Sequence, residues 1–344
     1  MNNNCKYGTN RVIEPKGALP QPALKVDNTP KIYSNELLID VDILNITSTA
    51  FSRLKQLAGG DKSKIAEQIK QIVFEKGKFQ CPETGSGGIL IGRVAEIGDD
   101  FHGKNTLKLG DKIATMVSLS LTPLRIDEIL DIDVKTDQVF IKGTAILFDS
   151  GLYAKIPRDI SEKISVAVID VTGASGWTAK CVKAGDYVVV LGAGKAGLLC
   201  LHEAKKRAGA TGKVIAIDPS QKQCELIKKL NLADEVLQLD ATQAVSVAKE
   251  VERVTDGRMA DFVVNTANVP NTEMASILAC RDYGTVLFFS MSTNFSKVVL
   301  GCEGVGKVLN PLFGIGYVDG TADITFQILR ENDELRNYFE EVYG

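Results

Sequence analysis

The chain has 344 residues, of which 44% are hydrophobic and 24% charged, and a formal net charge of −3 at pH 7. This composition is typical of soluble globular proteins and excludes disordered, collagen-like and disulfide-scaffold chains. Because 40 basic residues are balanced by 43 acidic ones without a basic cluster, a nucleic-acid partner is not expected.

Targeting segments, membrane spans and disulfides are not expected either. The start of the chain has neither the basic-then-apolar order of a signal peptide nor an Arg-rich transit pattern. No apolar run approaches the roughly 18 residues of a membrane helix. The seven cysteines form no C-x-x-C pair, which favours reduced thiols. We therefore expect a cytoplasmic protein without a membrane partner.

The first half of the chain is predicted to be rich in β-strands. Apolar and acidic residues alternate from Ile39 to Ile43, the period of a half-buried strand. Further strands are predicted over 88–98 and 110–117. Between the first two lies a predicted helix over 63–76, with an apolar face, Ser63 as its N-cap and Gly77 as its end.

In the second half, apolar strand-like runs alternate with helical patterns. This alternation predicts a parallel sheet with helices on both faces. The composition changes near residues 157–164, which is the expected junction between two domains. Strands are predicted over 187–191, 213–217, 262–264 and 286–289, and helices over 196–207, 221–230 and 323–343.

A glycine motif follows the first of these strands and opens the first of these helices. In this context Gly192 permits a tight turn, Gly194 lets the backbone approach a pyrophosphate, and Gly197 lets helix and strand pack closely. The phosphates would meet the positive end of the helix. The motif predicts a dinucleotide-binding loop, which also includes Lys195 and Ala196.

An acidic residue ends the next strand. Asp218 comes 21 residues after Gly197, the spacing of the carboxylate that binds the adenosine ribose hydroxyls. This carboxylate would repel a 2′-phosphate, so NAD is predicted, with weaker use of NADP. Lys222 lies four residues later and could soften that preference. Pro219 is included among the cofactor-binding residues.

Several segments resemble the medium-chain alcohol dehydrogenase superfamily, over nearly the whole chain. They are Gly110-Asp-Lys-Ile, Tyr153-Ala-Lys-Ile-Pro157, Gly185-Asp-Tyr-Val-Val-Val-Leu-Gly192 and Asp218-Pro-Ser. The resemblance implies an α/β fold, a Rossmann doubly wound parallel sheet plus a β-rich GroES-like catalytic domain. It assigns residues 1–160 to the catalytic domain, 161–300 to the NAD(P)-binding domain and 301–344 to a return segment of the catalytic domain. Because this superfamily commonly pairs Rossmann sheets edge to edge, the resemblance implies a homodimer or a larger homo-oligomer.

The zinc ligands of that superfamily are missing from the sequence. By the resemblance, the cysteine position falls on Thr47, the His and Glu positions fall on Gly88 and Ile89, and the last ligand position falls near Val171. Zinc needs three or four nitrogen, sulfur or carboxylate ligands, and the chain has two histidines in all. The sequence therefore predicts no metal site.

Within the superfamily, three segments are similar to zinc-free dehydrogenases of diamino acids: 46–54, 84–92 and 170–178. The resemblance implies NAD(P)-dependent oxidative deamination of (3S,5S)-3,5-diaminohexanoate to (5S)-5-amino-3-oxohexanoate and ammonium, in anaerobic lysine degradation. Alcohol oxidation benefits from a Lewis acid that stabilises an alkoxide. Amine oxidation forms no alkoxide, because the nitrogen lone pair drives hydride departure. It needs instead a base that keeps the amine neutral.

The same resemblance suggests which residues do the chemistry. Thr47 and Thr49 should face the nicotinamide, although an ST-turn is an equal alternative. Glu83 is a candidate base or ammonium ligand, and Asp170 flanks the position of the last zinc ligand. For both carboxylates, a solvated surface position is the alternative. Arg53 is a possible partner for the substrate carboxylate, although a surface arginine is the simpler interpretation.

Further contacts to the cofactor are expected in the second half. By the resemblance, Thr172 and Ser175 contact the nicotinamide ribose. Thr266 and Ser290 follow two predicted strands at the edge that usually faces the cofactor. Ordinary loop capping is the alternative for these last two.

Two other functions stay open at this point. The first alternative is a zinc-free quinone or enoyl reductase, which shares the architecture. Such reductases usually prefer NADPH, and Asp218 argues against that preference. The second alternative is a nucleotide-sensing protein without catalytic activity. The hydroxyl and carboxylate residues near the zinc-ligand positions argue mildly against it, because an inactive site has no need of them.

Overall fold

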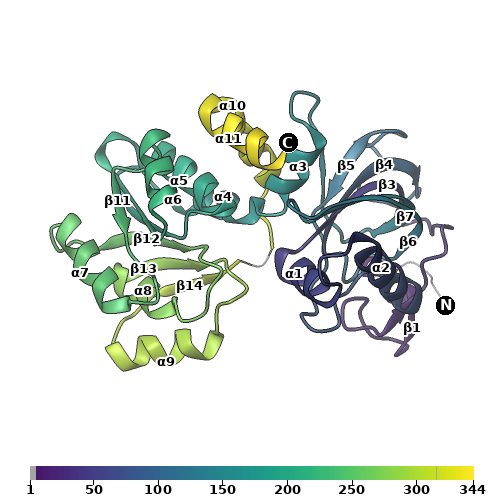
Figure 1. Cartoon of the computed structure of the whole chain (residues 1–344), viewed down its shortest axis with the longest axis horizontal. Coiled ribbons are helices and arrows are strands. Elements are labelled where there is room, and N and C mark those ends of the chain that lie inside the picture. The colour runs from purple at the N-terminus through teal and green to yellow at the C-terminus, as the bar shows by residue number, and fades with distance from the viewer. Residues whose placement is uncertain (1–4, 315) are drawn as a thin grey trace. The chain divides into compact units, whose positions relative to one another are not determined.

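The structure, a computed structural model, describes residues 5–314 and 316–344. The chain divides into two compact units (Figure 1). The first comprises Met1–Asp170 with Val342–Gly344, and the second comprises Val171–Glu341.

This division corrects the expected domain boundaries at two points. Residues 161–170, which contain α3 (Glu162–Ile169), belong to the first unit rather than to the Rossmann domain. Of the expected return segment, residues 301–341 stay in the second unit and Val342–Gly344 belong to the first. The reason is packing, because α10 (Thr321–Glu331) lies against α4 (Thr172–Cys181) in the same unit.

An antiparallel sheet forms the core of the first unit, with strand order β6-β7-β3-β4-β5-β8. In β3 the side chains of Ile39, Val41 and Ile43 are buried while Asp40 is exposed, so the predicted alternation is confirmed. The predicted strands over 88–98 and 110–117 are confirmed as β4 and β5. The strands are β3 (Glu36–Ile46), β4 (Gly88–Ile97), β5 (Lys112–Thr115), β6 (Leu124–Asp133), β7 (Gln138–Phe148) and β8 (Tyr153–Lys155), with a separate pair β1 (Val12–Glu14) and β2 (Lys25–Val26) and a 3-10 turn over Thr9–Arg11.

Two helices, α1 (Ser48–Leu57) and α2 (Lys62–Lys76), accompany this sheet. The predicted helix and its end at Gly77, with φ of 70°, are confirmed. Its N-cap is Asp61 rather than Ser63, because the Asp61 carboxylate accepts hydrogen bonds from the N–H groups of Ser63 and Lys64.

We expect Asp61→Ala to lower the free energy of unfolding by about 1 kcal/mol, because two N–H groups lose their acceptor. Ser63→Ala should change it by a few tenths of a kcal/mol at most, since the cap uses the Ser63 N–H and the Asp61 carboxylate, not the Ser63 hydroxyl. Urea unfolding of both variants compares the two directly. Equal losses would contradict the capping role of Asp61.

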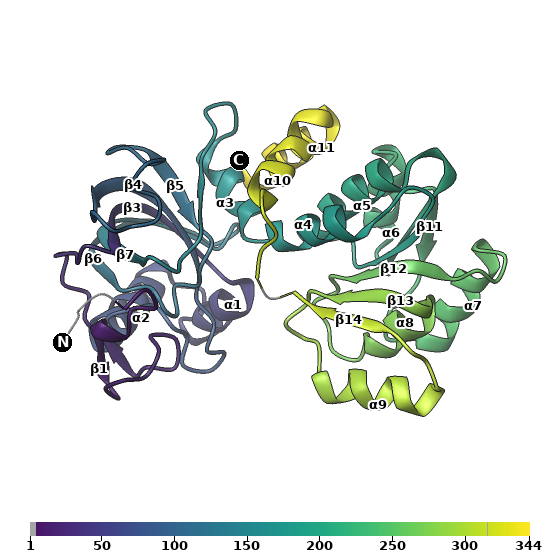
Figure 2. The ribbon, with the colours of Figure 1, turned by 180° about the vertical axis from the view of Figure 1, so that it is seen from behind.

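A parallel sheet forms the core of the second unit, with strand order β11-β10-β9-β12-β13-β14. Apolar side chains of α7, α8 and α9 pack on one face, and α5 and α6 lie on the other (Figures 1 and 2). The strands are β9 (Tyr187–Leu191), β10 (Lys213–Asp218), β11 (Glu235–Gln238), β12 (Ala260–Asn265), β13 (Cys280–Phe288) and β14 (Asn310–Phe313). The helices are α4 (Thr172–Cys181), α5 (Lys195–Ala208), α6 (Gln221–Lys229), α7 (Ala244–Val254), α8 (Glu273–Ala279), α9 (Phe295–Val305), α10 (Thr321–Glu331) and α11 (Asp333–Tyr343), with a 3-10 turn over Gly209–Thr211.

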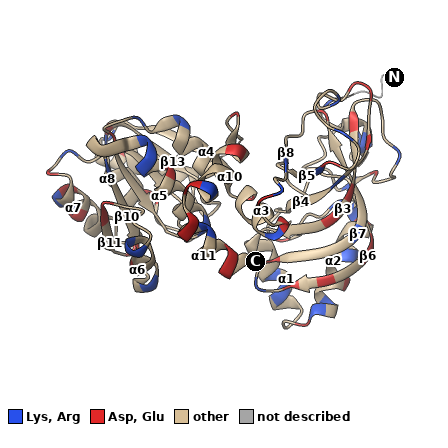
Figure 3. Cartoon of the chain, turned by 90° about the horizontal axis from the view of Figure 1, so that it is seen from above, with Lys and Arg blue, Asp and Glu red and all other residues tan. Residues whose placement is uncertain are grey.

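The predicted alternation of strands and helices is confirmed in this unit, with β9 matching residue for residue. The predicted helical stretch over 323–343 is two helices that meet at Asn332. Basic and acidic residues are interspersed over the elements of both units, in keeping with the balanced composition (Figure 3). Among the described residues, no helix is both long and apolar enough to cross a membrane.

Candidate functional site

The glycine loop lies between β9 and α5, as predicted. Gly192 has φ of 86°, and a Cβ there would lie 2.8 Å from the Cα of Ala267. A Cβ on Gly197 would lie 1.9 Å from the carbonyl oxygen of Gly192, so only glycine allows this close approach. A Cβ on Gly194 would meet no described atom within 4 Å. The loop is therefore tightly packed at its two ends and open in the middle.

This open middle meets the start of a helix. Gly194 is the N-cap of α5, and Lys195 and Ala196 form its first turn. No described side chain caps this end, so the amide groups and the helix dipole are available to an anion. A dinucleotide pyrophosphate fits this end of α5, because its N-terminus has no side-chain cap and the space beside Gly194 is open.

Asp218 lies beside the loop, at the end of β10. Its carboxylate accepts hydrogen bonds of 2.8 Å from the N–H groups of Ala193 and Ser220, and the residue is 8% exposed. These bonds hold the charge at the edge of the glycine loop. Pro219 is exposed next to it. The sequence thus placed the acidic group correctly beside the loop.

Thr266 and Ser290 also lie at the ends of strands. The Thr266 hydroxyl donates to the carbonyl oxygen of Gly192 at 2.7 Å and lies 3.1 Å from that of Leu191. It therefore supports the glycine loop from β12. The Ser290 hydroxyl accepts a hydrogen bond of 3.1 Å from the N–H of Ser292, which is local turn capping.

The expectation that the side chains of Thr172 and Ser175 contact the nicotinamide ribose is wrong. Both residues are 0% exposed. Thr172 donates to the carbonyl oxygen of Thr321 at 2.8 Å, and the Ser175 hydroxyl lies 2.8 Å from that of Thr325. These hydroxyls belong to the contact between α4 and α10. They stabilise the helix pair and are shielded from any cofactor.

In the first unit, three hydroxyls form a chain that we call the hydroxyl cluster. The Thr47 hydroxyl lies 2.8 Å from that of Ser86, which lies 2.7 Å from that of Thr84. Thr47 is the N-cap residue of α1. Its side chain accepts no hydrogen bond from the described backbone N–H groups at the start of that helix. Its hydroxyl is thus engaged with the cluster rather than with an ST-turn. Thr49 is exposed on the first turn of α1.

Sequence reasoning missed Thr84 and Ser86. The signal was present in the run Thr84-Gly-Ser-Gly-Gly, where hydroxyls are interleaved with glycines. A hydrogen bond of 3.3 Å from the N–H of Thr47 to the carbonyl oxygen of Gly87 holds this run against the start of α1.

Glu83 precedes the hydroxyl cluster and pairs with Arg53. The Arg53 Nε lies 3.3 Å from one carboxylate oxygen, and the Cys81 thiol donates to the other at 3.5 Å. Its own backbone N–H, together with Arg53 and Cys81, lowers the pKa of the Glu83 carboxyl below its ordinary value. A carboxylate with a lowered pKa stays ionised at neutral pH and can pair with a cation. Both side chains are exposed, so solvent screens the Arg53–Glu83 pair and leaves both groups accessible. Asp170 lies at the end of α3.

The residues present do not fit a zinc ion. Within residues 5–314 and 316–344, no three His, Cys, Asp or Glu side chains are gathered closely enough to hold a metal. The positions implied for zinc ligands carry a hydroxyl at Thr47 and no ligand atom in the side chains of Gly88 and Ile89.

Comparison with known proteins relates these features to two family models. The model described as the L-erythro-3,5-diaminohexanoate dehydrogenase N-terminal domain matches residues 10–157. The model described as zinc-binding dehydrogenase matches residues 196–301. An L-erythro-3,5-diaminohexanoate dehydrogenase of Acetoanaerobium sticklandii is 53% identical over 98% of this chain and 99% of its own length. One of Fusobacterium nucleatum is 51% identical over the full length of both.

The fold is shared with a wider set of solved structures. An alcohol dehydrogenase from Thermotoga maritima superposes with a TM-score of 0.55, at 17% identity, over 90% of this chain and 85% of its own. The expected fold class, a Rossmann sheet with a second, β-rich unit, is confirmed by this likeness and by the two sheets.

Proposed function

Because the chain belongs to the L-erythro-3,5-diaminohexanoate dehydrogenase family, we propose that it oxidises the C3 amine of (3S,5S)-3,5-diaminohexanoate to (5S)-5-amino-3-oxohexanoate and ammonium. As a member of this family it is an oxidoreductase that uses a nicotinamide cofactor. The observation that carries the substrate assignment is the similarity to two dehydrogenases of that name over the whole chain. The reaction is a step of anaerobic lysine degradation.

The second unit binds the cofactor, preferably NAD. The amide groups of Gly194, Lys195 and Ala196 bind the pyrophosphate, and Asp218 accepts hydrogen bonds from the adenosine ribose. The buried charge of Asp218 disfavours the 2′-phosphate of NADP, which binds more weakly. Thr266 holds the loop in place, and Pro219 and Ser290 border the cofactor site.

The first unit binds the substrate, which carries two amino groups and a carboxylate. A bound nicotinamide would accept the hydride that leaves C3. Water would then add at C3, supply the ketone oxygen and release the nitrogen as ammonium. The Thr47 and Ser86 hydroxyls orient the reacting nitrogen, which must be neutral for its lone pair to assist. The ionised Glu83 binds the second, charged amino group at C5. Thr49 and Asp170 complete the substrate contacts.

We expect Glu83→Gln to raise KM for the diamino acid about tenfold and to leave kcat nearly unchanged, because an ion pair to a group distant from C3 is lost. The carboxyl, with its lowered pKa, stays ionised above its ordinary pKa of 4.5. The ratio of mutant to wild-type KM should therefore be constant from pH 6 to 9.

Glu67→Gln, an exposed acidic side chain on α2, is the matched control and should leave both constants unchanged. Steady-state kinetics at several pH values measure these effects. A fall in kcat of Glu83→Gln with KM unchanged would assign Glu83 to the chemical step instead.

The reaction itself is tested by its products. Ammonium and reduced nicotinamide should form in equal amounts from the diamino acid. Reduction of a quinone or an enoyl substrate with NADPH, without such deamination, would favour the reductase instead. Binding of the cofactor without turnover of either substrate would favour a nucleotide sensor.

A homodimer formed through the edge of the second sheet is also part of this proposal. β14 lies at that edge, and the Phe295 ring of α9 lies 5.5 Å from the Phe313 ring of β14. The helix α9 lies beside β14 (Figure 2). Exposed apolar side chains occur on α9 and just before it, and such patches are typical of protein interfaces. They include Met291, Phe295, Val299 and Leu300, with exposed fractions of 88%, 64%, 48% and 64%.

We expect Leu300→Glu to shift the protein from dimer to monomer in sedimentation velocity, because a buried charge opposes the interface. Val245→Glu, at a similarly exposed apolar residue of α7, should leave the dimer intact. An unchanged dimer in Leu300→Glu would place the interface elsewhere.

A further inference from the structure

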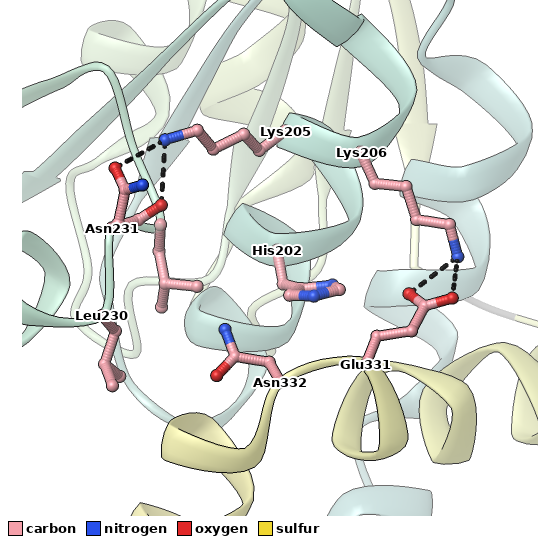
Figure 4. A pocket seen from close by; sticks show the side chains of 8 residues that line it. His202, Lys205, Lys206, Leu230, Asn231, Glu331 and Asn332 are labelled. Atoms are coloured by element: carbon pink, nitrogen blue, oxygen red, sulfur yellow. Dashed lines mark hydrogen bonds and ion pairs between the residues drawn. The ribbon is translucent and has the colours of Figure 1, made fainter.

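A pocket in the second unit lies at the far end of α5 from the glycine loop. Its cavity volume is about 520 Å³, within the range of about 300–1,000 Å³ that is typical of small-molecule sites. Three segments line it (Figure 4): the last turns of α5, the turn after α6 and the turn between α10 and α11. The lining residues are His202, Lys205, Lys206, Leu230, Asn231, Leu232, Glu331 and Asn332.

Hydrogen-bond donors exceed acceptors in this lining. Lys206 binds both carboxylate oxygens of Glu331, at 2.8 and 2.9 Å, and neutralises it. Lys205 donates to the backbone and side-chain oxygens of Asn231, both at 2.9 Å, and lies 3.6 Å from Asp234. The Lys205–Asp234 pair is long and both side chains are partly exposed, so solvent screens it and part of the Lys205 charge stays available to an anionic group.

Asn332 adds a fixed donor. Its side-chain oxygen accepts the N–H of Leu335 at 2.8 Å and caps α11. The amide nitrogen is therefore turned away from the helix and into the pocket, as Figure 4 shows.

His202 points into the same space (Figure 4). Its Nδ1 is buried and has no hydrogen-bond partner among the described residues. Burial lowers the pKa of the imidazole, which keeps the ring neutral with one nitrogen able to donate. Buried polar atoms are normally paired, so an unpaired one beside an anion-favouring surface indicates a ligand contact.

We infer that this pocket binds a small aliphatic carboxylate. The carboxylate oxygens accept hydrogen bonds from Lys205, from the Asn332 amide and from an N–H of His202. The hydrocarbon part lies against Leu230 and Leu232. Because the ligand joins segments from three parts of the second unit, its binding stabilises that unit at the end of α5 opposite the cofactor loop.

Three four-carbon probes test the head group on the full-length protein by isothermal titration calorimetry. Butanoate should bind, whereas 1-butanol and butylammonium at the same concentrations should give no binding heat. Asn332→Asp keeps the capping oxygen but replaces the donor by a negative charge. It should weaken butanoate binding at least tenfold without lowering the melting temperature.

Lys205→Gln should weaken butanoate binding as well, whereas Lys229→Gln, an exposed lysine of α6 outside the pocket, should not. Equal butanoate binding by the wild type and Asn332→Asp would overturn the proposal, because the ligand would then lie elsewhere, for example in the substrate site. Absence of binding by the wild type, or equal binding of 1-butanol, would overturn it too.

Discussion

Gly194→Ala is expected to weaken cofactor binding about a hundredfold while leaving the fold intact. Its φ of −71° is accessible to alanine, and a Cβ there meets no described atom within 4 Å. The added methyl group instead occupies the space through which the pyrophosphate approaches the start of α5. A hundredfold loss of affinity corresponds to about 2.8 kcal/mol, the order of the cost of an extra methyl group in a packed contact.

Gly197→Ala is the matched comparison. Its main effect should be on the stability of the fold, whereas that of Gly194→Ala should be on cofactor binding. The added Cβ of Gly197→Ala would lie 1.9 Å from the carbonyl oxygen of Gly192, so β9 and α5 must separate. We expect a loss of about 1–3 kcal/mol in the free energy of unfolding, accompanied by weaker cofactor binding. Thermal melting and fluorescence titration with NAD separate the two effects. Normal NAD affinity in Gly194→Ala would contradict the assignment of this loop to the pyrophosphate.

Asp218→Asn is expected to lower the preference for NAD over NADP, measured as the ratio of kcat/KM values, by about 10- to 100-fold. The substitution removes the charge that opposes the 2′-phosphate, and like charges placed together cost several kcal/mol. Asparagine keeps one side-chain oxygen for the N–H of Ala193 or Ser220, so the loop retains part of its support.

Lys222→Gln, on α6, removes a positive charge near the same site and is compared with Asp218→Asn. This exposed cation lies four residues after Asp218, and its removal should weaken the use of NADP further without affecting NAD. Steady-state kinetics with both cofactors give the two ratios. An unchanged ratio in Asp218→Asn would mean that other groups select the cofactor.

The Rossmann unit could be predicted well because its information is local. The buried strand Tyr187–Leu191 is a short apolar run, and the glycines and Asp218 stand at fixed spacings along the chain. The hairpin of β6 and β7 was missed. Most side chains of Leu124–Asp133 are exposed or half-buried, so the strand has no clear alternation to recognise.

The candidate site could be predicted only in part, because its contacts are not local. Nothing near Thr172 or Ser175 shows that Thr325, about 150 residues later, takes up their hydroxyls. Likewise, Ser86 reaches Thr47 across 39 positions of the chain. The resemblance indicated Thr47. Its hydrogen-bonded neighbours Ser86 and Thr84 could be identified only from the folded structure.

The most direct test of zinc-free amine oxidation is the rise in absorbance at 340 nm with NAD and 3,5-diaminohexanoate, with EDTA present throughout. We predict a steady rise that the chelator does not reduce, with one ammonium released for each nicotinamide reduced. Loss of the rate in EDTA and its recovery with added zinc would contradict the metal-free site. No rise with NAD or NADP, while the cofactor still binds, would contradict the diamino acid as substrate.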